Sequence, residues 1–494
     1  MPLPPPPPGH LDADHHHIPP LPWQRAVLFS LASIGVGMVF TFFNAQLPLY
    51  LRDYGMAHQW IGPLTNERSL AGALVLPIVG RMSDRARTRW GKRRPFFLAG
   101  APLLAAALVA LGLRPPFPIM LALVLAAGGF LFIALGPYQA MMADITPSHQ
   151  RGQVGSMTAL AGLVGAVIVS LLAAQWWETA SAWVFAATAA VLLLTFGLTF
   201  LLVREPADAA DLSPNPSPKG RGELGDLTPN PSPTKGGERD DFATALSDRA
   251  TGEASALVYE DFVSEAAEGL TPPLFAGRKV GELDRHLAPP SFVGKGVGGL
   301  GRLRAYWQDV RQFGPMNRYI GAMSLYWLAA GGATPFITLY GTETLHLTAN
   351  AASGLFLVLV LSTAVGTVGV GLLADRVGKR RVLHAGLALF ALAALAAANV
   401  SSVDAALPVM VLAGLGNACP TVLAVPLLAD LLPPKRAGEF LGLGSAIWSL
   451  VQPLGSFLAG SLVDSLGSNR WAFGFAALFM ALAAGALFGV PRET

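Results

Sequence analysis

The segment GRMSDRARTRWGKRRPFF (residues 80–97) decides how the rest of the sequence is interpreted. Seven of its eighteen residues are Arg or Lys, yet it lies between two apolar blocks, LAGALVLPIV (70–79) and LAGAPLLAAALVALGL (98–113). Cationic side chains are costly inside a hydrocarbon core, whereas a loop between two membrane helices keeps them in water. The segment therefore predicts a loop that joins two membrane-spanning helices.

The composition of the chain is that of a membrane protein. Of its 494 residues, 52% are hydrophobic and only 13% are charged, and the mean hydropathy is +0.49. A soluble domain carries about 25% charged residues. The net charge of +3 gives no indication of a nucleic-acid partner, and the single cysteine, Cys419, excludes a disulfide framework and a thiolate metal site.

Apolar runs long enough to cross a bilayer recur along the chain. About 20 helical residues span the hydrocarbon core, and we predict twelve such helices. They cover residues 25–50, 59–82, 95–113, 118–142, 153–174, 181–203, 317–340, 350–374, 382–399, 405–429, 438–463 and 471–490. Strands of an outer-membrane barrel are about ten residues of alternating polarity, so these longer continuous runs exclude a barrel. The expected fold class is an all-α membrane protein.

The loops between the predicted helices differ in charge. Basic residues collect on one side of the membrane, in the loops around 85–94, 376–381 and 435–436 and at Arg151. The other side carries only scattered residues such as Arg52. The positive-inside rule makes the basic side cytoplasmic and places both termini there. We therefore expect a multi-pass protein of the cell membrane (inner or plasma membrane).

Two regions have a composition that is typical of disorder. Residues 1–22 form a proline-rich tail, expected in the cytoplasm, in which the histidine run 15–17 is interpreted as solvated. In residues 204–301, the segment LSPNPSPKGRGE (212–223) recurs almost unchanged as LTPNPSPTKGGE (227–238). Short Pro-, Gly- and Ser-rich repeats cannot bury a core, so we predict a disordered cytoplasmic linker.

The linker is predicted to end in a helix that lies on the membrane. Residues 302–316 place apolar side chains at helical spacing among several arginines, a pattern typical of an interfacial helix. The remaining segments, 23–203 and 317–494, each hold six of the predicted spans.

The two six-helix segments repeat each other. GRMSDRARTRWGKRRP (80–95) corresponds to GLLADRVGKRR (371–381), and GPYQAMMADITPSHQRGQVGS (136–156) to AVPLLADLLPPKRAGEFLGLGS (424–445). The offsets are similar, 375 − 84 = 291 and 430 − 144 = 286. Two parallel repeats that enclose a central cavity are an arrangement known in secondary transporters. We therefore predict two pseudo-symmetric six-helix bundles.

These motifs resemble those of the major facilitator superfamily. The loop signature of that family, Gly-x-x-x-Asp-Arg-x-Gly-Arg/Lys-Arg/Lys, is matched once in each half, with an insertion in the first. The matching residues are Gly80, Asp84, Arg85, Gly91, Lys92, Arg93 and Arg94 in the first half, and Gly371, Asp375, Arg376, Gly378, Lys379 and Arg380 in the second. The resemblance implies the major facilitator fold, with these residues at a cytoplasmic gate.

Within the superfamily, SDRARTRWGKRRPFF and GPYQAMMAD resemble the sucrose/proton symporters and the glycoside–pentoside–hexuronide cation symporters. The resemblance implies a sugar or glycoside substrate. At positions where the cation symporters carry carboxylates on the second helix, this chain has Gly72 and Leu76. At positions of the Arg and Asp of the sucrose symporters on the fourth helix, it has Gln139 and Gly128.

The aspartates of the repeated loops are candidates for a latch. Asp84 and Asp375 follow the ends of their helices, where a carboxylate accepts from backbone N–H groups and pairs with Arg. Such contacts would hold the halves together on the cytoplasmic side. The alternative is that both are loop charges that only set topology.

Glu67 and Arg68 are the charged residues expected deepest in the membrane. They lie about two turns inside the outer end of the second span, where a charge needs water, a partner or a cavity. Glu67 is a candidate proton-coupling site or acceptor of a sugar hydroxyl, with Arg68 as its partner or as a substrate donor. The alternative is a structural ion pair or an interfacial position.

Amide and aromatic side chains complete the candidate substrate site. Amides both donate and accept, which suits a hydroxyl-rich ligand, and aromatic rings stack on a sugar face. The candidates are Asn44, Gln46, Tyr138, Gln139, Tyr326, Trp327, Asn417 and Gln452. Helix-to-helix hydrogen bonding and packing are the alternatives for each. Glu343 and His346 are expected in a loop at the outer end of the seventh span.

The sequence predicts a secondary transporter that works by alternating access, as a monomer among membrane lipids. The favoured activity is symport of a sugar or glycoside with protons. The alternatives are an exporter of amphiphilic drugs or other small solutes, and a non-transporting sensor that signals through the linker. No GxxxxGK[ST] loop and no HExxH spacing occurs, so we expect neither ATP hydrolysis nor a metal, no other cofactor and no enzyme activity.

Overall fold

The computed structural model describes residues 21–203 and 313–489, except for 87, 89, 148, 149 and 433–436. All of these belong to one compact unit. The predicted tail (1–22) and linker (204–301) lie outside the described residues, apart from the last two residues of the tail. Of the predicted interfacial helix (302–316), only 313–316 are described, and 314–316 already belong to the next membrane helix.

The first half consists of helices only, in the residues that the structure describes. In chain order the elements are α1 (Trp23–Ser30), α2 (Ala32–Asp53), α3 (His58–Thr65), α4 (Glu67–Arg85), α5 (Arg94–Gly112), α6 (Phe117–Ile145) and α7 (Arg151–Leu202). The backbone of Ala180 is not helical, and α7 turns there. Leu21 bonds to Gln150 at one end of α7, and Thr199 at the other end bonds to Leu28, so the two arms of α7 are antiparallel.

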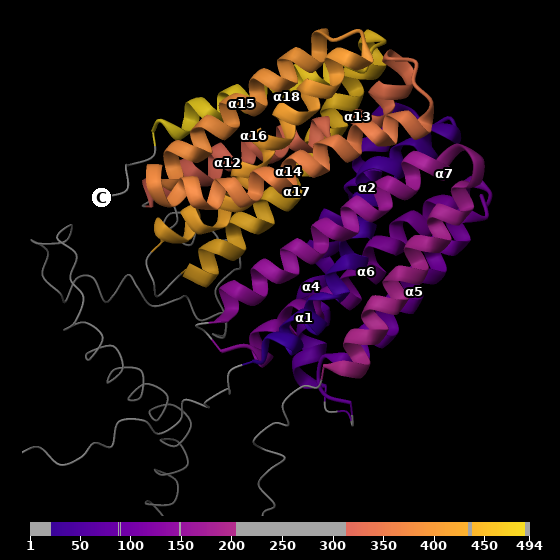
Figure 1. Cartoon of the computed structure of the whole chain (residues 1–494), viewed down its shortest axis with the longest axis vertical. Coiled ribbons are helices and arrows are strands. Elements are labelled where there is room, and N and C mark those ends of the chain that lie inside the picture. Colours follow the sequence, from indigo (N-terminus) through magenta and orange to yellow (C-terminus); the bar gives the residue numbers. More distant parts are fainter. Residues whose placement is uncertain are drawn as a thin grey trace, which may run out of the picture. The chain divides into compact units, whose positions relative to one another are not determined.

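The second half is also built from helices. Its elements are α12 (Gly314–Ala333), α13 (Phe336–Leu339), the π-helical turn η3 (Tyr340–Thr344), α14 (Ala349–Val377), α15 (Lys379–Asn399), α16 (Val403–Asp430), α17 (Ala437–Leu466) and α18 (Arg470–Leu487). Figure 1 shows the helices of the first half in indigo to magenta and those of the second half in orange to yellow.

The predicted set of about twelve membrane helices is confirmed. Ten described stretches are long and apolar enough to cross a membrane. One of them, Gln153–Leu202, is 50 residues long and holds both arms of α7, which gives an eleventh crossing. The twelfth is α3 with α4. The chain breaks between these two because the side chains of Thr65 and Asn66 both bond to the carbonyl of Gly62 and so compete with the helical pattern there.

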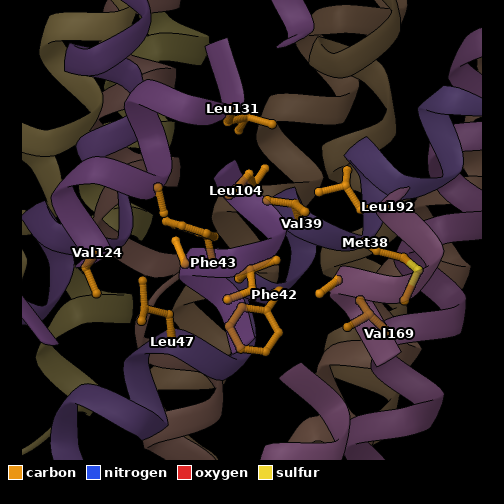
Figure 2. Packing of buried hydrophobic residues seen from close by; sticks show 14 of the residues in the cluster. Met38, Val39, Phe42, Phe43, Leu47, Leu104, Val124, Leu131, Val169 and Leu192 are labelled. Carbon is orange, nitrogen blue, oxygen red and sulfur yellow. The ribbon is translucent and has the colours of Figure 1, made fainter. Parts of the chain in front are cut away.

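The core of the first half gathers around α2. Figure 2 shows Phe42 and Phe43 of this helix among apolar side chains of its neighbours. These include Leu104 of α5, Leu131 of α6 and Leu192 of α7, all at most 1% exposed. Lipid tails are as apolar as leucine, so van der Waals packing between helices contributes more to this core than removal from water does. The interlocked side chains fix α2 relative to α5, α6 and α7.

Equivalent hydrogen bonds show the internal repeat in three dimensions. The Tyr50 hydroxyl donates to the carbonyl of Leu111 at 2.6 Å, and the Tyr340 hydroxyl donates to the carbonyl of Ala397 at 3.0 Å. The two donors are 290 residues apart and the two acceptors 286, close to the offsets in the sequence. The prediction of two pseudo-symmetric bundles is therefore confirmed.

Candidate transport cavity and gates

The two ends of the helical bundle differ in their loops, and we call them the basic end and the opposite end. The basic end holds the described residues of the loop 86–93, the turn at Gly378 and the last residues of α7 and α18. The opposite end holds 54–57, 113–116, 345–348, 400–402 and 467–469. Arg94 donates to the carbonyl of Phe200, and Arg380 donates to those of Leu487 and Phe488, so both repeated motifs lie at the basic end.

A cavity of about 270 Å³ lies between the helices and extends toward the opposite end, where Ala397 and Phe473 line it. Both halves line it: Thr41 and Asn44 come from α2, whereas most of its wall comes from α12, α14, α15 and α16. Its polar lining is Thr41, Asn44, Tyr326, Trp327, Thr334, Thr363, Asn417, Thr421 and Gln452. Among the described lining residues there is no Asp, Glu, Lys, Arg or His. In the part that the structure describes, the cavity wall is therefore mainly apolar, and the polar groups on it are uncharged.

Five of the ten predicted substrate or coupling residues meet in this cavity, namely Asn44, Tyr326, Trp327, Asn417 and Gln452. The Tyr326 hydroxyl donates to the amide oxygen of Asn417 at 2.9 Å and fixes the direction of that amide. The rings of Tyr326 and Trp327 lie edge to face, with centroids 5.0 Å apart. Among the described residues, the buried indole N–H of Trp327 has no hydrogen-bond acceptor.

Three of the predicted residues lie elsewhere. Tyr138 is 1% exposed, stacks on Phe29 and donates to the carbonyl of that residue, so it packs α6 against α1. Gln139 is exposed and does not line the cavity. Gln46 is fully buried, and neither amide atom has a partner in the part of the chain that the structure describes.

The remaining pair, Glu67 and Arg68, begins α4 directly after the break at Asn66. The backbone of both residues is therefore helical and follows a local interruption of the second membrane crossing. Free backbone N–H groups at such a helix start favour a carboxylate nearby.

At the basic end, the repeated motif forms an ion-pair clamp inside each half. Arg93 pairs with Asp84 of α4 at 2.5 Å and with Asp144 of α6 at 3.0 Å. Lys379 pairs with Asp430 of α16 at 2.6 Å. The two cations are 286 residues apart, as are Asp144 and Asp430. Each clamp joins helix ends of the same half, so these ion pairs do not themselves join the halves.

The other residues of the predicted gate surround these clamps. Arg85, Asp375 and Arg376 are exposed, and Lys92 is half-buried. Gly91 and Gly378 have positive φ, 104° and 97°, a conformation that favours glycine and turns the chain at the end of each motif. A Cβ atom on Gly80 or Gly371 would meet nothing within 4 Å in this arrangement.

At the opposite end, an ion-pair network joins the two halves; we call it the His58 latch. It consists of Arg52 and His58 from the first half and Glu343, Asp464 and Asn469 from the second. His58 Nδ1 lies 2.7 Å from Asp464 Oδ1, and His58 Nε2 lies 2.9 Å from Glu343 Oε2. Arg52 Nε donates to Glu343 Oε1 at 2.6 Å, and the Asn469 amide donates to Glu343 Oε2 at 2.7 Å.

Backbone geometry strengthens the latch. The N–H groups of His58 and Gln59, at the start of α3, donate to the two carboxylate oxygens of Asp464 at 3.2 and 2.9 Å. Negative charge is favourable at a helix N-terminus. A Cβ atom on Gly460 would lie 2.4 Å from the carbonyl of His58, so α17 approaches α3 this closely only because that position is glycine.

Two further contacts between the halves lie at or near the same end. Glu178 accepts from the backbone N–H of Ala349, and its own backbone N–H donates to the side-chain oxygen of Asn350. The Thr338 hydroxyl donates to the carbonyl of Ala45 at 2.8 Å. Together with the His58 latch, these bonds hold the halves against each other at the opposite end.

The expectation that Glu343 lies in a loop is wrong, because Glu343 belongs to η3 and extends the helical path beyond α13. His346 is exposed and has a positive φ of 53°. Sequence reasoning also missed His58, Asp464 and Asn469. The one available signal was the position of His58, directly before the expected start of the second span. Nothing in the sequence indicates that residues 58, 343 and 464 lie together.

Metal binding has no support in the described part of the chain. There, no group of three or more His, Cys, Asp or Glu side chains is placed to hold an ion.

The repeated bundles, the uncharged central cavity and the contacts between halves at one end are the architecture of a secondary transporter. The chain belongs to the Major Facilitator Superfamily, whose sequence profile matches residues 29–249 and 319–494. It is a secondary transporter and not an enzyme, with about twelve helices in the fold of that family.

Similar proteins include carriers with several different substrates in their names. The chain is 28% identical over 152 residues to the sucrose transport protein SUC4 of Arabidopsis thaliana, a match that covers 26% of this chain and 29% of that protein. The chain thus spans about a third of the length of the curated relatives it matches. These matches show a distant similarity to plant sucrose transporters.

Solved structures resemble the whole fold at low sequence identity. A D-xylose-proton symporter has a TM-score of 0.61 at 15% identity, over 94% of this chain and 98% of that one. A bacterial homologue of the human lysosomal transporter Spinster has a TM-score of 0.62 at 13% identity, over 94% and 96%. These likenesses show the fold alone.

Proposed function

We propose that this transporter carries a neutral, hydroxyl-rich solute, a sugar or glycoside of the sucrose class, in symport with protons. The observation that carries the proposal is the cavity wall, which offers amides, hydroxyls and an indole but no charged side chain among its described residues. A charged substrate in a membrane-embedded site needs an opposite charge, whereas a sugar needs paired donors and acceptors.

Individual groups of the wall suit a sugar. The amide of Asn417, held by Tyr326, has its nitrogen available as a donor, and the Trp327 indole N–H adds another donor that no described residue engages. The aromatic faces of these residues match the apolar face of a pyranose ring. The relatives named for sucrose transport support the same class of solute.

The contacts between the halves indicate which end of the transporter is closed, and the basic loops indicate which side of the membrane that end faces. The opposite end is closed by the His58 latch, and we place this end outside the cell, because the basic end has the Arg- and Lys-rich loops that favour the cytoplasm. In alternating access the two ends close in turn. Residues 23–203 and 317–494 would then be the two moving halves and 204–301 a cytoplasmic linker.

The loops around Asp84 and Asp375 would close the cytoplasmic end in the other conformation. In the described arrangement the Asp84 carboxylate pairs with Arg93 of its own half, and Gly80 and Gly371 have open space around them. Both features fit a gate whose surfaces are separated here. Glu67, at the helix break of the second crossing, is the proposed site of proton coupling.

Ligand binding to purified protein tests the substrate class. We expect sucrose or a related glycoside to bind, and Asn417→Ala to weaken its binding about 2- to 13-fold, because one hydrogen bond is worth about 0.5–1.5 kcal/mol. Asn399→Ala is the matched control, since among the described residues Asn399 bonds only to the carbonyl of Leu395 at the end of α15. Binding of hydrophobic cations without any sugar would favour the drug exporter, and binding of neither would favour the sensor.

A further inference from the structure

The geometry of the His58 latch assigns a proton-binding site to the interface between the two halves. We propose that one proton, held on the imidazole of His58, is a ligand of the arrangement in which the opposite end is closed. The proposal depends on alternating access, which membership of the family carries, and not on the identity of the transported solute.

The two hydrogen bonds of His58 define its protonation state. Both ring nitrogens lie within 2.9 Å of a carboxylate oxygen, from Asp464 on one side and from Glu343 on the other. An ionised carboxylate only accepts, so both bonds need an N–H on the imidazole. A neutral imidazole has one N–H, and only the imidazolium has two. The closed latch therefore selects protonated His58.

The charges around His58 favour the same state. On the described elements packed around α3, the charged groups that face His58 are Arg52 of α2, Glu343 of η3 and Asp464 of α17. Asp53 of α2 is engaged by Arg114 at 3.0 Å. With His58 protonated, two cations balance two carboxylates. With His58 neutral, one carboxylate loses its counter-charge and a ring nitrogen without a proton faces an anion.

Because His58 is buried, the difference in charge balance between its protonated and neutral states has a large effect on the stability of the closed end. The side chain of His58 is only 9% exposed, whereas Glu343 and Asp464 are each 29% exposed. Burial alone would lower the pKa of His58, but the hydrogen bonds to Glu343 and Asp464 outweigh it and raise the pKa above its usual 6.5. The contribution of His58 to closure is thus complete below about pH 6.5 and is lost as the pH rises through the raised pKa.

The position of the site shows where its proton goes. His58 lies at the end that is closed when it is protonated, away from the basic end. When that end opens, the carboxylates of the second half move away and the proton returns to the compartment on the same side. The site therefore sets how closure depends on the pH of that compartment, whereas proton transfer across the membrane needs another group, such as the proposed Glu67.

A distance measurement between the halves tests the site without any substrate. Spin labels at Leu113→Cys and Ser401→Cys, in a Cys419→Ala background, place one label on an exposed residue of each half at the opposite end. Pulsed electron resonance in nanodiscs between pH 5 and 9 should show a short-distance population that dominates below about pH 6.5 and declines at higher pH.

Variants assign this titration to His58. His58→Gln should lower the short-distance population at acid pH and remove its pH dependence. Asp464→Asn should move the midpoint down by about 1–3 pH units, because one neighbouring carboxylate has lost its charge. His346→Gln, which changes an exposed histidine three residues from Glu343, should match the parent.

The outcomes are distinct from those for the transported solute. A population that does not change with pH in the parent protein, or an unchanged titration in His58→Gln, would overturn the proton site even if sugar transport is found. If His58→Gln does not fold, the parent titration and the Asp464→Asn shift decide the question. Failure of sugar binding would leave the proton site intact.

Discussion

At the scale of single residues, ionisable groups are separated from the cavity. The described cavity wall contains neutral polar groups, whereas His58, Glu343 and Asp464 lie at the opposite end and Arg93 and Asp84 at the basic end. A carrier of a neutral solute gains from this separation, because a charge beside the substrate would need its own partner inside the membrane. The charges instead act where the halves or helix ends meet.

Glu67 is the residue on which the proposed coupling depends most. We expect Glu67→Gln to abolish the pH dependence of sugar uptake while exchange of sugar at equal pH on both sides continues, because an amide keeps the shape of the side chain but binds no proton. Uptake into proteoliposomes at several pH values measures this. Asp404→Asn is the matched control, because this exposed carboxylate lies in the first turn of α16 and does not line the cavity. Unchanged pH-dependent uptake in Glu67→Gln would remove Glu67 from the mechanism.

At the scale of helices, each repeated motif turns the chain sharply between two membrane crossings. Gly378 ends α14 with a φ of 97° and directly precedes α15, whose first residue, Lys379, pairs with Asp430. Arg380 then donates to the last carbonyls of α18, which a helix C-terminus leaves unsatisfied. The basic motif thus fixes helix ends within each half in addition to orienting them in the membrane.

The turn at Gly378 can be tested by stability. Gly378→Ala should lower the free energy of unfolding by about 1–2 kcal/mol, because a Cβ atom is strained at this positive φ. Gly369→Ala is the control: Gly369 lies inside α14 with open space around it, so alanine should be neutral or stabilising by up to about 1 kcal/mol. Thermal unfolding in detergent compares the two. Equal effects of both variants would show that the backbone conformation of Gly378 does not matter.

Helix positions followed from the sequence because hydrocarbon thickness sets the length of every apolar run. The predicted span 350–374 corresponds to α14 (Ala349–Val377), and the turn at Ala180 lies in the gap between the predicted spans 153–174 and 181–203. The break before Glu67 could not be foreseen, since it depends on two side chains that bond to the Gly62 carbonyl. These side-chain hydrogen bonds interrupt the helix but leave the hydropathy of the segment unchanged, so the apolar pattern gives no sign of the break.

At the scale of the whole molecule, the sequence predicts only part of the cavity lining. Asn44 and Gln452 come from different halves, and both line the cavity, as we expect of amides on membrane helices. Tyr138 has the same chemistry as Tyr326 but packs inside its own half, because Phe29 and Ser33 engage it. Composition alone does not distinguish these two tyrosines.

The His58 latch lay beyond sequence reasoning for a related reason. Its hydrogen-bonded partners are separated by up to 406 residues, and each alone is an ordinary polar residue at a helix end. Only the packing of α3 against α17 and η3 makes them one site. The same packing closes the opposite end, so the conformation and the site appear together in the structure.

The central claim, proton-coupled transport of a neutral sugar, is tested most directly by uptake into proteoliposomes. A panel of radiolabelled sugars, glycosides and hydrophobic cations would be offered with an inward proton gradient, with and without a proton uncoupler. We predict that sucrose or a related glycoside accumulates above its external concentration and that the uncoupler abolishes the accumulation. Accumulation that survives the uncoupler, or exchange of hydrophobic cations with no sugar uptake, would contradict the account.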